Sequence, residues 1–289
     1  MSAPFAAADG LVRVYPAQGS ATGDLVVWTH GGGFQWGDLD MPEADWVSRA
    51  FAARGIAVVS VDYRRASATV HFPAPSDDVL DAYLWAREHA FELGADPTRV
   101  VIGGASAGAN LTAGVAMRLD DGEGPAPAGI FLAYPTLHAV QPPTPPELER
   151  ALDDLPDEAR FDAARVLAMY EAYLGGPVED ASIIAIPGTA TPADLTGLPP
   201  VLMINDDLDG LRVSGEAFAA TLAEAGVRVE VVTEPGTQHG HLNRPGEPQA
   251  AASVARVLAW IATLSAPDDS PPPPNPSVSP EPTGSEREK

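Results

Sequence analysis

The apolar residues of this chain fall into short runs separated by longer amphipathic stretches. Leu25–Thr29 and Ile56–Val61 are almost wholly apolar, which is typical of strands buried on both faces. Pro42–Arg54, between them, carries apolar residues at helical spacing. The alternation continues with a helix capped by Ser76 and running to about Leu93, a strand at Val100–Ile102 with a helix after it, and a strand at Gly129–Tyr134.

This alternation of strand and helix predicts an α/β fold with a mostly parallel central sheet and helices on both faces. A short outer strand is expected at Leu11–Tyr15. After an interruption the alternation resumes, with strands at Leu198–Ile204 and Val227–Val232 and helices at Leu211–Ala225 and Glu247–Leu264.

Two segments depart from the alternation. Pro135–Pro177 begins with prolines and polar residues and continues as acidic helical sequence, so we expect a cap or lid, at about residues 136–177, over one end of the sheet. Ala266–Lys289 is rich in proline, serine and acidic residues, and such a segment cannot bury enough apolar surface to offset its ordering entropy. We therefore expect one domain over residues 1–265 and a disordered tail over 266–289.

A serine among small residues follows the strand at Val100–Ile102. Gly104-Ala105-Ser106-Ala107-Gly108 fills the G-x-S-x-G pattern of a nucleophile elbow, a sharp turn from strand to helix. The two glycines allow strand and helix to approach closely, and the two alanines add only a methyl group each. In the alternative interpretation, Ser106 only caps the helix that follows.

A serine hydroxyl is a poor nucleophile and needs a base, which in turn needs an orienting acid. In this type of fold the order along the chain is serine, acid, histidine. Asp206, Asp207 and Asp209 follow one late strand, and any of them could be the acid. His239 and His241 follow the next strand and are the two candidates for the base.

The chain also offers backbone donors for an oxyanion. The run His30-Gly31-Gly32-Gly33 follows a buried strand, and glycines expose their amides to a ligand. The expected donors are the N–H groups of Gly31 or Gly32, together with that of Ala107. A glycine-rich loop could instead hold a phosphate, but neither Gly-Lys-Ser/Thr nor G-x-G-x-x-G accompanies it, so nucleotide binding is not expected.

Taken together, these motifs resemble the hormone-sensitive lipase branch of the α/β-hydrolases over about residues 11–264. No single motif decides the matter, but their order and spacing are specific. The matching segments are His30–Phe34 with Gly37-Asp38, Val61–Arg64, Phe72–Ala74 with Asp77-Asp78, Gly104–Asn110, Leu198–Pro200, Asp209–Arg212 and Pro235–Gly240.

The resemblance implies an α/β-hydrolase fold and a serine hydrolase that cleaves small, short-acyl carboxylic esters through an acyl-enzyme. The family's aspartate precedes Leu-Arg after one small residue, which selects Asp209, and its histidine precedes glycine, which selects His239. Ser106, Asp209 and His239 are then the implied triad. The chain departs from the family at Ala105, where an aspartate is common, at Val213-Ser214, where an acidic pair is usual, and in the few residues before the oxyanion strand, which imply a reduced cap.

Four further side chains are candidates for the substrate pocket: Phe34, Trp36, Tyr134 and His241. Each aromatic residue could equally belong to the core. Two rival functions stay open, namely an amidase or formamidase with the same triad, and a ligand-binding protein without catalysis on the same scaffold.

Composition limits the partners. The net charge of −23 argues against nucleic acid and anionic membranes, and the absence of cysteine excludes disulfides and thiolate catalysis. The first ten residues lack a basic, apolar leader and no run is long enough to cross a membrane, so a cytoplasmic protein is expected. We expect a small-molecule ester as substrate, with no cofactor and no metal, and a homodimer is compatible with the sequence.

Overall fold

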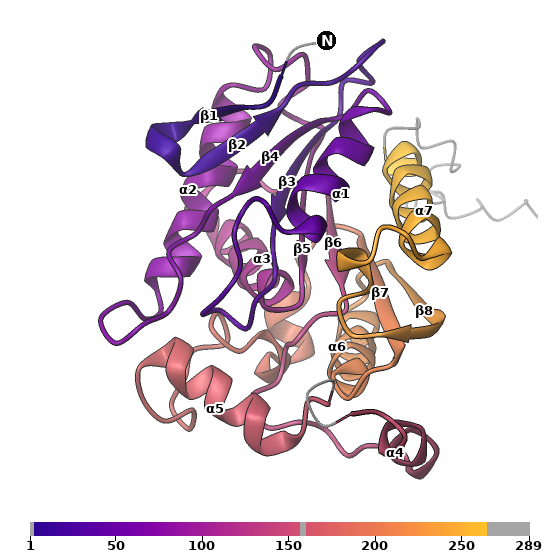
Figure 1. Ribbon diagram of the computed structural model, residues 1–289. Coiled ribbons are helices and arrows are strands. Elements are labelled where there is room, and N and C mark those ends of the chain that lie inside the picture. The colour runs from indigo at the N-terminus through magenta and orange to yellow at the C-terminus, as the bar shows by residue number, and fades with distance from the viewer. Residues whose placement is uncertain (1–2, 157–159, 265–289) are drawn as a thin grey trace, which may run out of the picture.

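The computed structural model describes residues 3–156 and 160–264. Within them the strands form one eight-stranded sheet in the order β1-β2-β4-β3-β5-β6-β7-β8 (Figure 1). The strands are β1 (Phe5–Ala7), β2 (Val12–Tyr15), β3 (Leu25–Thr29), β4 (Ala57–Val61), β5 (Val100–Ala105), β6 (Gly129–Ala133), β7 (Val201–Leu208) and β8 (Val229–Gln238).

The sheet is mostly parallel. β4, β3, β5, β6, β7 and β8 pair in parallel, and only β1 and β2 are antiparallel, at one edge. Leu25 of β3 lies opposite Ala57 of β4 and Val100 of β5, so the neighbouring strands start level with one another. The predicted α/β class is therefore confirmed. Because these strands run the same way, their carboxyl ends meet at one end of the sheet.

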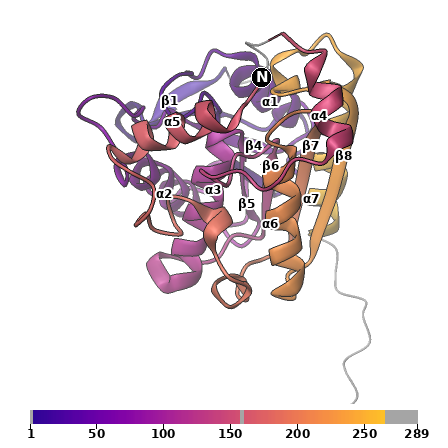
Figure 2. The same ribbon diagram turned by 90° about the horizontal axis from the view of Figure 1, so that it is seen from below.

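The central strands bury both faces. Leu25 and Val27 of β3 belong to one core cluster and Val26 and Trp28 to the other, as expected when successive side chains alternate across a sheet. Helices α1 and α7 cover the face of Trp28, and α2, α3 and α6 cover the opposite face (Figures 1 and 2). These helices are α1 (Pro42–Ala52), α2 (Ala74–Glu88), α3 (Ala107–Arg118), α6 (Arg212–Glu224) and α7 (Pro248–Leu264).

The segment between β6 and β7 lies across one end of the sheet, at the bottom of Figure 1. It contains α4 (Pro146–Asp153) and α5 (Ala163–Leu174), followed by short 3₁₀ turns at Pro187–Thr189 and Pro192–Leu195. In α5, Tyr170 and Tyr173 are fully buried, and the Tyr170 hydroxyl donates a hydrogen bond to Asn110 Oδ1 at 2.8 Å. Helix α5 is therefore packed against the domain by buried aromatic residues.

Some predicted boundaries were wrong. β7 and β8 extend beyond Ile204 and Val232, because the two strands go on pairing as far as Leu208 and Gln238. Ser76 does not cap α2. The helix begins earlier, at Ala74, where a proline at its second position favours helical geometry, and Ser76 Oγ accepts a hydrogen bond from Arg118 instead.

Other parts of the prediction were incomplete or are not tested. β1 and the turns Ala8–Gly10, Leu119–Glu123 and His241–Asn243 were not expected. The predicted tail, 266–289, lies outside the described residues.

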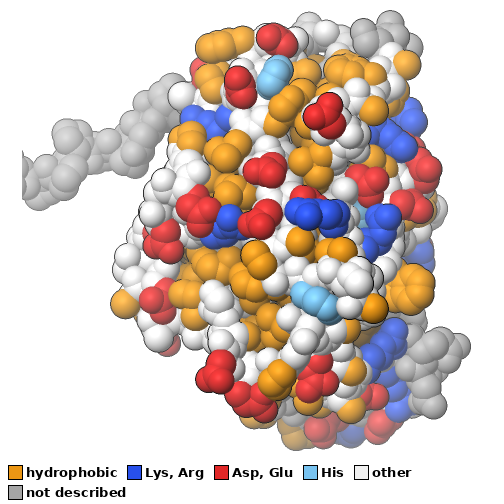
Figure 3. Space-filling model, turned by 90° about the vertical axis from the view of Figure 1, so that its left-hand side faces the viewer, with side chains coloured by type: hydrophobic (Ala, Val, Ile, Leu, Met, Phe, Trp, Pro, Cys, Tyr) orange, Lys and Arg blue, Asp and Glu red, His pale blue; other side chains and the backbone are white. Residues whose placement is uncertain are grey.

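Two surface properties bear on the partners. None of the helices in the described part of the chain is long and apolar enough to cross a membrane. On the face shown in Figure 3, acidic side chains are interspersed with arginines and apolar side chains, so the negative charge is not gathered in one patch there.

Candidate active site

Ser106 stands at the junction of β5 and α3 in a strained backbone conformation. Its φ is 52° and its ψ is −118°, a region that L-residues rarely occupy and that often marks a functional site. The Ser106 amide donates to the Ala133 carbonyl at 2.9 Å, and its own carbonyl accepts from Ala109 and Asn110, so the turn is held on both sides. The Ser106 hydroxyl makes no helix-capping hydrogen bond, which rules out the interpretation of this serine as a simple cap.

The glycines of the elbow are required by close backbone contacts. A Cβ atom on Gly104 would lie 2.4 Å from the Gly108 carbonyl oxygen. A Cβ atom on Gly108 would lie 2.3 Å from the carbonyl oxygens of Thr29 and His30, at the end of β3. The small residues therefore bring the elbow, the helix and the glycine run after β3 into direct contact.

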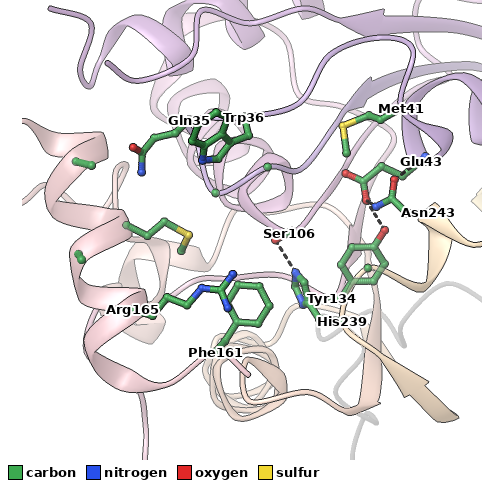
Figure 4. Close-up of a pocket in the computed structure, with 16 residues that line it drawn as sticks. Gln35, Trp36, Met41, Glu43, Ser106, Tyr134, Phe161, Arg165, His239 and Asn243 are labelled. Carbon is green, nitrogen blue, oxygen red and sulfur yellow. Dashed lines mark hydrogen bonds between the residues drawn. The ribbon is translucent and has the colours of Figure 1, made fainter. Parts of the chain in front are cut away.

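A chain of hydrogen bonds connects Ser106 to a buried carboxylate. Ser106 Oγ lies 2.9 Å from Nε2 of His239, the first residue after β8 (Figure 4). His239 Nδ1 lies 2.7 Å from Oδ2 of Asp209, the first residue after β7. Asp209 is 1% exposed, and its other oxygen accepts from the Leu211 amide at 2.9 Å. This arrangement fixes the imidazole so that Nε2 faces the serine.

Charges around His239 set its pKa. Burial is the largest single effect and lowers this pKa, but the charge and the hydrogen bond of Asp209, together with the charges of Asp206 and Glu43, outweigh it. The pKa of His239 therefore lies above its ordinary value of 6.5. The same charges stabilise an imidazolium, the form that His239 takes after accepting a proton.

The competing aspartates and histidines have separate partners. Asp206 pairs with His241 Nδ1, and His241 Nε2 lies 2.8 Å from Ser253 Oγ on α7. His241 is fully buried and does not line the cavity, so its placement in the pocket was wrong. Its hydrogen bonds on both ring nitrogens hold it between β7 and α7.

Asp207 points to a third set of partners. Its carboxylate accepts from Arg212 at 3.1 Å and from the Gly236 amide at 2.9 Å. It is about one third exposed. Geometry thus joins only Asp209 and His239 to Ser106.

The oxyanion donors differ in one respect from expectation. The Gly31 amide donates to Oε1 of Glu43 at 2.6 Å and is not available to a ligand. Within the described residues, the amides of Gly32, Gly33 and Ala107 have no hydrogen-bond partner. Gly31 is therefore replaced by Gly33 as a candidate, because Glu43 satisfies the first amide of the glycine run.

A cavity of about 630 Å³ opens above Ser106 and His239. Trp36 and Tyr134 line it, as expected, and Trp36 is largely exposed at 74%. Phe34 does not, because its ring is fully buried against Tyr173, with the ring centroids 4.1 Å apart. From the cap segment, Phe161 and residues of α5, Arg165, Ala168, Met169 and Ala172, form the opposite wall (Figure 4).

The sequence did not indicate that Glu43, Asn243 and Phe161 line this cavity. Glu43 lies in the first turn of α1, where an acidic residue needs no function beyond favouring the helix N-terminus. Asn243 lies four residues after His239, and Phe161 just before α5. No motif marks any of the three, and only the fold brings them to the cavity.

Three potential metal-binding atoms also lie close together. Asp206, Asp209 and His239 each offer one such atom, all within 4.8 Å of one another. These groups also take part in hydrogen bonds: Asp206 with His241, Asp209 with His239, and His239 with Ser106. Each of these three groups is therefore already bound to a side chain of the protein.

Comparison with known proteins places this geometry in context. A family model described as the α/β hydrolase fold matches residues 26–243. Carboxylesterase NlhH of Mycobacterium tuberculosis is 39% identical over 261 residues, which are 88% of this chain and 79% of that protein. Ethyl acetate hydrolase of Pseudomonas putida is 31% identical, over 79% of this chain and 70% of that protein. The solved structure of a bacterial heroin esterase is 33% identical with a TM-score of 0.73, and the match covers 88% of this chain and 78% of that one.

Proposed function

The chain belongs to the hormone-sensitive-lipase-like branch of the α/β-hydrolase family, and from that membership we propose that Ser106, Asp209 and His239 carry out its carboxylic ester hydrolysis. The observation that carries the proposal is the pair of hydrogen bonds from Ser106 to His239 at 2.9 Å and from His239 to Asp209 at 2.7 Å. Because the serine also lines the cavity, an ester can reach its hydroxyl.

In the first half of the reaction, His239 Nε2 removes the proton of Ser106 Oγ as that oxygen attacks the ester carbonyl carbon. The carbonyl oxygen becomes an oxyanion. His239 then gives its proton to the leaving alcohol as the bond between carbon and alcohol oxygen breaks, which leaves an acyl group on Ser106. Asp209 holds the imidazole in place and stabilises its charged form.

In the second half, His239 removes a proton from water, which attacks the acyl carbon. The bond to Ser106 Oγ breaks, the serine recovers its proton from His239, and the carboxylic acid leaves. We propose that the amides of Gly32, Gly33 and Ala107 bind the oxyanion in both halves of the reaction, because they donate no hydrogen bond to another group within the described residues. The start of α3 adds its helix dipole at Ala107.

The substrate is proposed to be a small ester with a short acyl chain. The cavity of about 630 Å³ suits a small molecule, and a relative named for ethyl acetate hydrolysis supports the same size class. The segment of about residues 136–177 is proposed to act as the lid, because Phe161 and α5 form a wall of the cavity. A cytoplasmic location and a homodimer stay predictions.

Two rivals are separated by direct assays. An amidase or formamidase would use the same triad, and rates on an aryl ester and its matched amide distinguish it; we expect the ester to be strongly preferred, as the named relatives are ester hydrolases. A binding protein without catalysis would not be labelled at Ser106 by a fluorophosphonate probe, whereas the proposed enzyme is.

A further inference from the structure

A carboxylate lies in the wall of the cavity next to the nucleophile. Glu43 is 1% exposed and lines the cavity from the first turn of α1. A methyl group on Gly31 would lie 2.7 Å from Glu43 Oε1 and 3.1 Å from Cβ of Ser106. Because both atoms crowd the same position, Glu43 Oε1 lies within about 6 Å of the Cβ atom of Ser106.

All the groups that hydrogen-bond to the Glu43 carboxylate in the described part of the chain are neutral. Its Oε1 accepts from the Gly31 amide at 2.6 Å, and its Oε2 accepts from the Tyr134 hydroxyl at 2.7 Å and from Asn243 Nδ2 at 2.8 Å. These donors fix the carboxylate without neutralising its charge. A buried charge is usually paired, so an uncompensated one beside a cavity is an unusual feature that calls for a function.

The charge of Glu43 acts on the neighbouring Tyr134 and on His239. Burial raises the pKa of Tyr134 most, and the Glu43 charge raises it further. Glu43 also adds to the raised pKa of His239. Among the residues that line the cavity, the one arginine or lysine is Arg165, on α5, where its guanidinium lies 4.5 Å over the centre of the Phe161 ring. In Figure 4, Glu43 and Arg165 lie on opposite sides of Ser106, so this guanidinium is not the partner of Glu43.

We propose that Glu43 is a specificity-determining residue that makes the cavity favour esters carrying an ammonium group and disfavour esters carrying a carboxylate. The inference rests on the proposed ester hydrolysis at Ser106. A cation bound beside Glu43 would balance the negative charge that the three neutral hydrogen-bond donors leave in place. An anion there would meet a carboxylate held in place by three hydrogen bonds.

Pairs of esters that differ only in charge test this inference. For a charge on the alcohol part, butyrylcholine is compared with 3,3-dimethylbutyl butyrate, in which a carbon atom replaces the nitrogen. On the acyl side, the ethyl ester of 4-(trimethylammonio)butyrate is compared with ethyl 5,5-dimethylhexanoate. The measured quantity is the ratio of kcat/KM for the charged ester to that for its neutral match, at about 0.5 M salt, where the field of the whole acidic protein is screened within a few ångströms.

The variant Glu43→Gln keeps an acceptor for the Gly31 amide and removes the charge. We expect the charged-to-neutral ratio of at least one pair to fall by roughly tenfold or more in this variant, because a unit charge about 12 Å away at an effective dielectric constant near 20 already gives a factor of that size. An ester bearing a carboxylate should gain relative to its neutral match. Asp40→Asn is the matched control, because it removes the same charge from a side chain that is 82% exposed, and it should leave both ratios unchanged.

If both ratios are the same in the wild type and in Glu43→Gln, the inference is wrong. If that variant does not fold, the wild type decides, since ratios near one for both pairs would overturn the inference and a ratio well above one would support it. Ester hydrolysis itself is checked on the neutral esters with Ser106→Ala. Neutral esters that the wild type cleaves and Ser106→Ala does not would leave the proposed function standing whatever the ratios show.

Discussion

The Nε2 atom of His239 lies 2.9 Å from the Oγ atom of Ser106, although 133 positions of sequence separate them. The contact exists because β5 and β8 deliver both residues to the same end of a parallel sheet. At this distance a proton can pass directly from the hydroxyl to the imidazole. The charge state of His239 should therefore control the reaction.

The first prediction concerns pH. His239 accepts a proton only when neutral, and its pKa is raised above 6.5 by Asp209, Asp206 and Glu43 against the opposing effect of burial. Activity should therefore fall as pH decreases through this raised pKa, so the acid limb of kcat/KM should have its midpoint above 6.5. A pH profile on a neutral ester measures it, and a midpoint at or below the ordinary value would show that the charges do not act as described.

The second prediction concerns Asp209. In Asp209→Asn the amide has nearly the same shape as the carboxylate, but it carries no charge and favours the wrong tautomer of His239. The value of kcat should therefore fall by about 10³–10⁴-fold. The acid limb of the remaining activity should move to lower pH. Asp207→Asn is the control, because Asp207 faces Arg212 and Gly236 rather than His239. Equal losses in the two variants would contradict the assignment.

The third prediction concerns the oxyanion loop. Gly32 has a φ of +116°, and a Cβ atom there would lie 2.1 Å from the Trp36 carbonyl oxygen, so Gly32→Ala must move the loop. Loss of one aligned donor costs about 10²–10³-fold in kcat. Gly246→Ala, where no atom lies within 4 Å of the added Cβ, should have little effect. Steady-state kinetics on a short ester measure kcat, and an unchanged kcat in Gly32→Ala would contradict this assignment.

The fourth prediction concerns stability. His241 and Asp206 are both fully buried, and His241→Ala leaves the Asp206 carboxylate without its imidazole partner. The free energy of unfolding should fall by about 3–5 kcal/mol, because the carboxylate stays buried and loses its partner. His89→Ala, at the end of α2 and only partly buried, should cost about 1 kcal/mol or less. Denaturant titrations of the two variants compare the losses, and similar values would argue against a structural role for the pair.

The sequence predicted the strands that are buried on both faces, because apolar runs such as Leu25–Thr29 have few alternatives in a folded chain. It was less successful with β7 and β8. Their extensions contain Asp206 and Glu234, polar residues that pair with each other only because both strands continue there. Pairing between strands is a tertiary property that a single stretch of sequence does not show.

The site was predictable where a motif fixes the backbone. Ser106 and its glycines are dictated by close contacts, and the order of acid and histidine follows from the strand order. The roles of Gly31 and His241 could not be predicted, because they depend on Glu43 and Ser253, which lie in unmarked helical sequence. Phe34 was equally ambiguous, since only the position of Tyr173 in the cap segment decides that its ring belongs to the core.

The central claim is that Ser106 is the nucleophile of an ester hydrolase, and its most direct test is the hydrolysis of a 4-nitrophenyl ester of a short acid by the wild type and by Ser106→Ala. Circular dichroism and thermal unfolding confirm that the variant folds. We predict that the wild type turns over the ester and that the folded variant loses the activity. A folded Ser106→Ala protein that retains turnover would contradict the account.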